Sequence, residues 1–104
     1  METIVKILVN ETKAPARKLA DAELHFRGGD LHGLKLVGFA IWQRRDRDGC
    51  DVIFPSREFT LDGRRRRYAL LRAMGDPSAQ DRVRDLVLRA YATVDEHATT
   101  PTGV

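Results

Sequence analysis

Cysteine is nearly absent from this sequence: Cys50 stands alone among 104 residues. A lone cysteine excludes an intrachain disulfide and a zinc site built from several cysteines. No apolar run approaches the roughly 20 residues that a membrane-spanning helix needs. The first three residues carry no basic side chain, and Lys6 interrupts the apolar stretch that follows, so no signal peptide is predicted. These absences favour a cytoplasmic protein without a membrane partner.

Residues typical of catalysis or metal binding are also sparse. The histidines, His25, His32 and His97, are scattered and lack a ligand spacing such as HxxxH. Ser56 lacks the GxSxG context of a serine nucleophile, and no glycine-rich phosphate loop is present. Cys50 has no histidine near it in sequence and is more typical of a buried strand cysteine. We therefore expect no enzyme, no metal site and no cofactor.

Lysine is scarce, whereas arginine is abundant. Only four of the 18 basic residues are lysines, and 15 acidic residues reduce the formal net charge to +3. Arginine binds phosphate through two parallel hydrogen bonds and stacks on bases, so this preference suits nucleic acid better than lysine would. The composition of a GC-rich genome is an alternative explanation for the same bias.

The length fits one domain, and the residue pattern predicts the α+β class. Alternating and β-branched residues predict strands over 3–9, 19–26, 34–42, 51–54 and 64–73. We expect one small antiparallel β-sheet of about five strands, in a single domain over residues 1–96 with a flexible tail over 97–104. The segment 34–42 is apolar on both faces, so we expect the terminal helix to cover one face and a partner subunit the other.

The strongest helical pattern lies near the carboxyl terminus. Apolar residues at helical spacing predict an amphipathic C-terminal helix over residues 79–95. Asp76 is predicted to be its N-cap, with Pro77 at the first helical position.

Three groups of arginines lie at the ends of predicted strands. One group lies in the polar loop 44–49, one residue follows the Pro55-Ser56 pair, and four consecutive arginines begin the strand 64–73. Strand ends lie at the rim of a sheet, so we expect the three groups to meet in one phosphate-binding surface. The candidate nucleic-acid-binding residues are Arg57, Arg64, Arg65, Arg66, Arg67, Arg44, Arg45 and Arg47.

The run of four arginines has an alternative interpretation. In a strand, successive arginines of the run face opposite sides: Arg64 and Arg66 share one face, and Arg65 and Arg67 share the other. At least one pair therefore points to solvent. Such a charged strand start also serves to block edge-to-edge aggregation, without any ligand. Phe54, Phe59 and Tyr68 offer stacking faces for bases near these arginines. Phe54 and Tyr68 are more typical of a core, and we predict them there.

Five segments occur in the order found in one known family. They are residues 18–26, residues 32–42, residues 49–57 with the ending Phe54-Pro55-Ser56-Arg57, residues 62–68 with their Asp-Gly start, and residues 76–91 with their terminal tyrosine. On these segments the chain resembles the SpoVG family (stage V sporulation protein G, the septation regulators), as a divergent relative. The ending at Arg57 is similar to the family's MPSK segment, and residues 62–68 are similar to its DGxxRDIAHP segment.

The resemblance implies a homodimer formed through strands and a regulator that binds DNA or RNA with little sequence preference. In the family, a basic pair directly after Pro-Ser is implicated in binding. Arg57 matches the first member of that pair, whereas Glu58 stands at the second position. The family's His-Pro is also absent, and Leu70-Leu71 stands there instead. The resemblance therefore assigns phosphate contact to Arg57 first.

A second function remains open at this point. The doubly apolar segment 34–42 and the acidic residues among the arginines also suit a protein–protein interaction or dimerisation module without nucleic-acid binding. In that case Phe39 and Trp42 are the expected contact residues.

Overall fold

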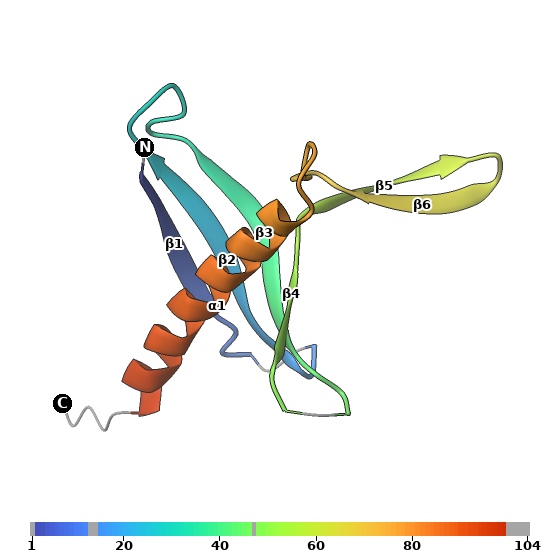
Figure 1. The fold of residues 1–104 in the computed structure, drawn as a ribbon. Helices are drawn as coiled ribbons and strands as arrows, with labels where there is room; N and C mark the ends of the chain where they lie inside the picture. Colours follow the sequence, from blue (N-terminus) through green and yellow to red (C-terminus); the bar gives the residue numbers. More distant parts are fainter. Residues whose placement is uncertain (1, 13–14, 47, 100–104) are drawn as a thin grey trace.

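The computed structural model describes residues 2–12, 15–46 and 48–99. The elements in chain order are β1 (Glu2–Val9), β2 (Lys18–Arg27), β3 (Lys35–Gln43), β4 (Cys50–Ile53), β5 (Ser56–Leu61), β6 (Arg64–Ala69) and α1 (Ser78–Thr99). Strands β1 to β4 form an antiparallel sheet in that order, and β5 and β6 form a separate hairpin (Figure 1). The α+β class with one C-terminal helix is confirmed, but the described strands are six in two sheets instead of about five in one.

β5 is the strand that the sequence analysis did not predict. Pro55 ends the ladder of β4, and the sequence pattern predicts no element between it and the Asp62-Gly63 turn. Asp62 and Gly63 have φ angles of 53° and 76°, which is the pair of positive values that a two-residue type I′ turn requires. Such a turn directs the chain back on itself, so the segment before it pairs with β6.

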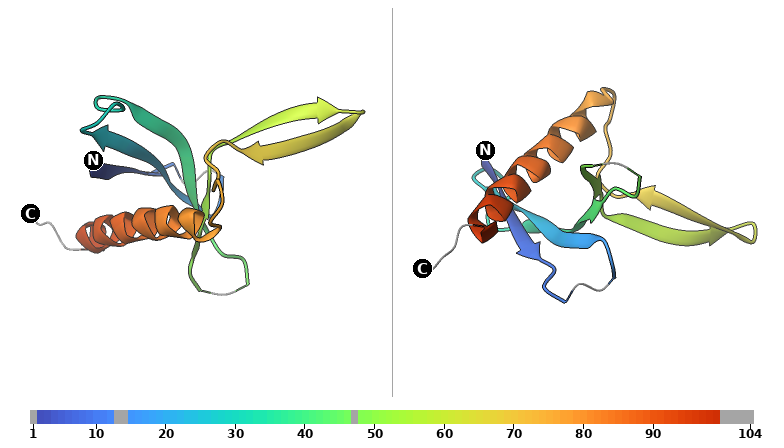
Figure 2. Two further views of the ribbon diagram at one scale, coloured as in Figure 1. Left: turned by 45° about the horizontal axis from the view of Figure 1, so that its top comes forward. Right: turned by 90° about the horizontal axis from the view of Figure 1, so that it is seen from below.

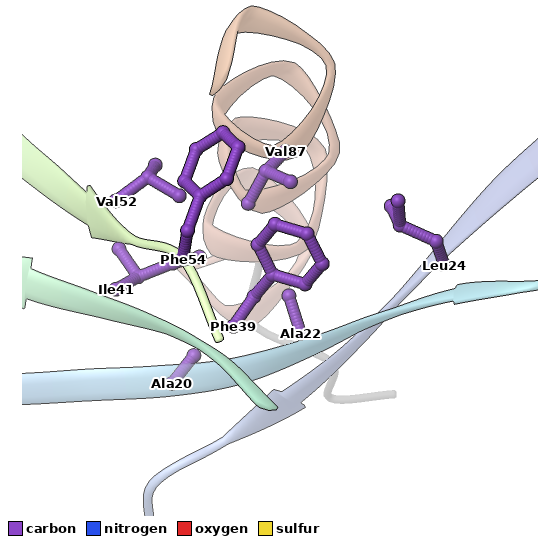
Figure 3. Packing of buried hydrophobic residues seen from close by; sticks show 8 residues of the cluster. All are labelled: Ala20, Ala22, Leu24, Phe39, Ile41, Val52, Phe54 and Val87. Atoms are coloured by element: carbon purple, nitrogen blue, oxygen red, sulfur yellow. The ribbon is translucent and has the colours of Figure 1, made fainter. Parts of the chain in front are cut away.

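The core lies between the four-stranded sheet and α1, which crosses one face of that sheet (Figure 2). Its buried residues are Ala20, Ala22, Leu24, Phe39, Ile41, Val52, Phe54 and Val87 (Figure 3). Phe39 and Phe54 meet edge to face with ring centroids 5.2 Å apart, and Val87 of α1 is fully buried beside them. The prediction of Phe54 as a core residue is therefore confirmed.

The other face of the sheet is polar along β2, and no described element covers it. Asp21, Glu23 and His25 alternate there with the buried residues of the same strand. Glu23 Oε1 lies 2.9 Å from His25 Nε2 and 3.3 Å from Lys35 Nζ. The hydrogen bond with His25 is the main reason that the pKa of Glu23 lies below its ordinary value, and Lys35 adds to the effect. The expected cover of this face by a partner subunit stays a prediction.

A bulge in β3 lies against the point where the chain leaves the sheet. Ala22 pairs with Phe39 and Leu24 pairs with Leu36, so β3 holds one more residue than β2 between these pairs. Gly38 lies in this bulge with a φ of 107°, and a Cβ at Gly38 would be 2.9 Å from Cβ of Pro55. The chain turns away from the sheet at Pro55.

The helix begins as the sequence predicts and ends later. Asp76 Oδ1 accepts hydrogen bonds from the backbone N–H of Ser78 at 3.0 Å and from its hydroxyl at 2.7 Å, which confirms the N-cap. The helix continues to Thr99, four residues past its predicted end at Asp95. Residues 97–99 therefore belong to α1 and not to a tail, and the rest of the predicted tail lies outside the described residues. In the part of the chain that the structure describes, no helix is both long and apolar enough to cross a membrane.

Candidate nucleic-acid interface

The hairpin of β5 and β6, residues 56–69, projects away from the rest of the molecule. We call it the arm and call the sheet with α1 the body. In all three ribbon views the arm extends past the body without lying on the sheet or on the helix (Figures 1 and 2). Every arm residue in a strand is exposed except Ala69, which is half-buried at the base. The hydrogen bond from Leu70 N to Pro55 O, at 2.8 Å, closes that base.

The net positive charge of the chain resides in the arm. Five arginines stand there against Glu58 and Asp62, which gives +3, equal to the formal net charge of all 104 residues. The remaining residues are balanced in charge. An exposed projection with all of the excess charge concentrates the positive potential where a polyanion can reach it.

The strand register divides the arm into two faces. Residues directly opposite each other in an antiparallel pair share a face, and successive residues alternate. The arginine–aromatic face consists of Arg57, Phe59, Leu61, Arg64, Arg66 and Tyr68. The Glu58 face consists of Ser56, Glu58, Thr60, Arg65, Arg67 and Ala69. The predicted alternation of the four consecutive arginines is therefore confirmed, and all four are exposed.

Glu58 is the one acidic residue within the two strands of the arm. Glu58 Oε1 is 3.6 Å from Arg65 Nη1, and Glu58 Oε2 is 3.6 Å from Arg67 Nη2. Exposed ion pairs of this length contribute little to stability. Their effect is electrostatic: one carboxylate partly offsets two guanidinium groups.

The arginine–aromatic face has no such acid. Among the described residues, no carboxylate forms an ion pair with Arg57, Arg64 or Arg66. The departure from the SpoVG pattern at Glu58 therefore reduces the charge of the opposite face and leaves the face of Arg57 unchanged. Arg57 and Glu58 are neighbours in sequence, but alternation along a strand places their side chains on opposite faces.

Two aromatic rings stack on the arginine–aromatic face. The rings of Phe59 and Tyr68 have centroids 4.9 Å apart and an interplanar angle of 14°. They come from diagonally related positions, since Phe59 pairs with Arg66 and Tyr68 pairs with Arg57. Phe59 is 40% exposed and Tyr68 is 41% exposed. The prediction that Tyr68 belongs to the core is wrong, because its strand leaves the sheet that α1 covers.

An open hollow of about 340 Å³ borders this stack at the base of the arm. It is lined by Arg57, Phe59, Tyr68, Leu70 and Arg72. Arg72 was not among the predicted site residues. The alternation of Arg66, Tyr68 and Leu70 continues to Arg72 at the same spacing, and that pattern was the signal that could have found it.

The other predicted arginines lie elsewhere. Arg44 and Arg45 belong to the loop that precedes β4, whereas the arm follows the end of β4, so the strand separates the two regions (Figure 1). Arg44 Nε donates to Asp51 Oδ1 at 3.0 Å. Arg47 lies outside the described residues. The expected single surface is therefore wrong for Arg44 and Arg45, because the prediction assumed one sheet with one rim.

The loop before β4 forms its own smaller basic site. A hollow of about 320 Å³ is lined by Arg17, Trp42, Gln43, Arg44, Arg45, Asp46 and Asp51. Two carboxylates in this lining offset the arginines, in contrast to the arginine–aromatic face. Arg17 is a further residue that the sequence analysis did not select.

The remaining candidates have structural contacts. His25 contacts Glu23, and His32 Nδ1 accepts a hydrogen bond from Gly28 N at 2.7 Å in the turn between β2 and β3. Cys50 is half-buried and packs against the core, as a strand cysteine does. Within the described ranges, no three His, Cys, Asp or Glu side chains gather where they could hold a metal ion. The arm thus offers cations and aromatic faces, which are groups for binding.

Comparisons with protein-family models, with curated proteins and with solved structures gave no match. The relationship to the SpoVG family stays a prediction from the sequence.

Proposed function

We propose that the chain is a regulatory protein that binds DNA or RNA through the phosphate backbone, with little sequence preference. The arm is the observation that carries this proposal: it projects from the body and holds the whole excess of positive charge. Guanidinium groups bind phosphate oxygens bidentately, and contacts to phosphate carry no sequence information. The resemblance to the SpoVG septation regulators independently supports the same activity.

The arginines of the arm have different roles in this proposal. Arg57, Arg64 and Arg66 are the leading phosphate contacts, because no acid shares their face. Arg65 and Arg67 contribute less, since Glu58 offsets both. Arg44 and Arg45 act as a second, separate contact region for a long strand, together with the predicted Arg47. The proposed activity is binding without catalysis and requires no cofactor.

Salt-dependent binding tests the proposal. Fluorescence anisotropy with a short duplex and a single strand, between about 50 and 200 mM salt, should give a Kd of micromolar or tighter and a steep fall with salt. The double variant Arg64→Ala/Arg66→Ala should weaken binding and reduce the slope of log K against log salt by about two. The matched control, Arg27→Ala/Arg89→Ala, removes the same charge from exposed positions of the body. No binding at about 50 mM salt, or equal losses in both double variants, would contradict the proposal.

A homodimer formed through strands, with or without nucleic acid, is the second candidate. Exposed apolar residues favour it: Leu34 and Val37 are 59% and 50% exposed near the start of β3. Phe39, one of the two expected contact residues, is fully buried under α1 and belongs to the core of one subunit. Sedimentation velocity of the full chain should give a dimer, and Leu34→Asp/Val37→Asp should give a monomer. A wild-type monomer at high concentration would contradict this candidate.

A further inference from the structure

We infer that the arginine–aromatic face binds unpaired bases, so that the protein prefers single-stranded nucleic acid over a duplex. In this mode a base stacks beside Phe59 and Tyr68 while Arg57, Arg64 and Arg66 contact the phosphates. The inference rests on the proposed function and specifies its ligand.

The exposure of the two rings is the first argument. Phe59 and Tyr68 leave about two fifths of their surface in solvent. Among the residues of the hairpin, Ala69 at its base packs against the core, and the two rings do not. The rings are nearly parallel, so each covers the inner face of the other and keeps an outer face. A base that stacks on an outer face extends the pair, and every base has such a π-face. This mode of binding tolerates any sequence.

The hollow at the base of the arm is the second argument. Both rings line it, and Arg57 and Arg72 line it with them. An aromatic surface flanked by guanidinium groups combines base stacking with phosphate contact in one place. Its volume of about 340 Å³ lies at the lower end of the range for small-ligand sites, which suits one nucleotide unit at a time.

The spacing of the arginines is the third argument. Residues of one strand that share a face are about 6.6 Å apart, since a strand rises about 3.3 Å per residue. Arg64 and Arg66 are separated by this interval along β6, and Tyr68 follows them at the next one. An extended nucleic-acid strand repeats its phosphates at intervals of the same order. A strand laid along the face therefore meets cations at its phosphates and rings at its bases.

A duplex uses this face less well. Paired bases are stacked on each other and offer no π-face to Phe59 or Tyr68. A two-stranded β-ribbon also fits the major groove of B-DNA. In that mode the arginines would contact base edges and phosphates, and the rings would add no stacking.

Four probes of equal length separate these modes: oligo-dT, oligo-U, an abasic strand with the same number of phosphates, and a duplex. The wild-type protein should bind oligo-dT or oligo-U about tenfold more tightly than the abasic strand, because stacking on one base is worth about that factor. The difference between oligo-dT and oligo-U distinguishes DNA from RNA as the preferred source of the strand.

Variants that keep the β-strands but remove the rings test whether Phe59 and Tyr68 cause the preference for nucleic-acid strands that carry bases. Phe59→Val/Tyr68→Val retains apolar, β-branched residues and should bind the base-bearing strands no better than the abasic one. Its affinity for the abasic strand and its salt slope should equal those of the wild type. Tyr68→Phe keeps the ring and should keep the preference. Thr60→Val, on the Glu58 face, is the matched control and should change nothing.

Photo-crosslinking locates the base independently of affinity. Trypsin cleaves the arm into peptides that separate the two rings, residues 58–64 with Phe59 and residues 68–72 with Tyr68. A strand containing 5-iodouracil should crosslink to one or both of these peptides. Crosslinks confined to the loop 44–49 would overturn the inference.

The outcomes also separate this inference from the proposed function. Equal affinity for the base-bearing and abasic strands, or tighter binding of the duplex, would overturn the single-strand inference and leave phosphate binding intact. Absence of binding to all four probes at low salt would overturn both.

Discussion

Gly38 lies against Pro55 so closely that a single added carbon would collide with it. The Cβ of any other residue at position 38 would lie 2.9 Å from Cβ of Pro55. The φ of 107° at Gly38 is also one that other residues rarely adopt. The contact joins the bulge in β3 to the residue where the chain leaves the sheet for the arm.

Gly38→Ala should therefore destabilise the protein by about 3 kcal/mol, through backbone strain and the collision together. Gly33→Ala is the matched control, because Gly33 has a φ of 88° with no atom within 4 Å of the added carbon. It carries the strain without the collision and should cost about 1 kcal/mol. Chemical denaturation measures both values. Equal losses in the two variants would contradict a role for the contact with Pro55.

The arm should open independently of the body. A lone two-stranded hairpin is marginally stable, and the arm lacks buried residues apart from its half-buried base. Tyr68→Ala should accelerate amide hydrogen exchange in β5 and β6 and leave global unfolding unchanged. Phe39→Ala, in the core, should instead lower global stability by about 3–5 kcal/mol. Uniform exchange across β2, β3 and the arm would show that they open as one unit.

Glu58→Gln should increase affinity for nucleic acid severalfold at low salt. The substitution removes the carboxylate that lies 3.6 Å from both Arg65 and Arg67, so two further cations become available to phosphates. The salt dependence should steepen as well. Glu11→Gln changes the net charge equally at an exposed position of the body and is the control. The same gain in affinity in both variants would mean that affinity depends on the net charge of the protein and not on the position of Glu58.

Asp76 should make the stability of α1 depend on pH in the acidic range. Its hydrogen bonds from the hydroxyl and backbone N–H of Ser78 hold the pKa of Asp76 below the ordinary value. The stabilisation is present above the pKa of the unfolded chain, about 3.9, and is lost as the pH falls through the lower value of the folded state.

The comparison of variants at several pH values checks this assignment. Asp76→Ala should unfold at a lower temperature than the wild type at pH 7, and the difference should shrink as the pH falls below about 4. Asp76→Asn keeps an acceptor for the Ser78 N–H without a titrating group, so its stability should vary less with pH there. A difference that stays constant with pH would contradict the role of the carboxylate.

The sequence predicted the elements that local patterns determine. The strands of the body and the helix were predicted within a few residues, because period-two alternation, glycine turns and the Asp76-Pro77 start are local signals. The α+β class follows from their order. The end of the helix was predicted too early, because the apolar pattern stops before Asp95. Residues 96–99 contain no glycine or proline to end the helix, so it continues to Thr99.

The arrangement of the strands in space could not be predicted in the same way. Nothing local distinguishes a hairpin that stays in the sheet from one that leaves it. In the structure the chain leaves the sheet at Pro55, which lies against Gly38 in the bulge of β3. For this reason Tyr68 was wrongly predicted in the core, and Arg44 was wrongly predicted on the same surface as the arginines of the arm. The residues of each face of the arm could have been predicted from the sequence. The Asp62-Gly63 turn fixes the register of the two strands, and alternation along each strand then assigns every residue to a face.

The separation of the arm from the core has a consequence for how this protein can change over time. Buried residues constrain one another, so a substitution among Phe39, Phe54 and Val87 requires compensation from its neighbours. The exposed residues of the arm are free of that constraint. Its exposed charges and rings can be exchanged one at a time without repacking the core, and the chain can thereby acquire new ligands while the fold of the body stays the same.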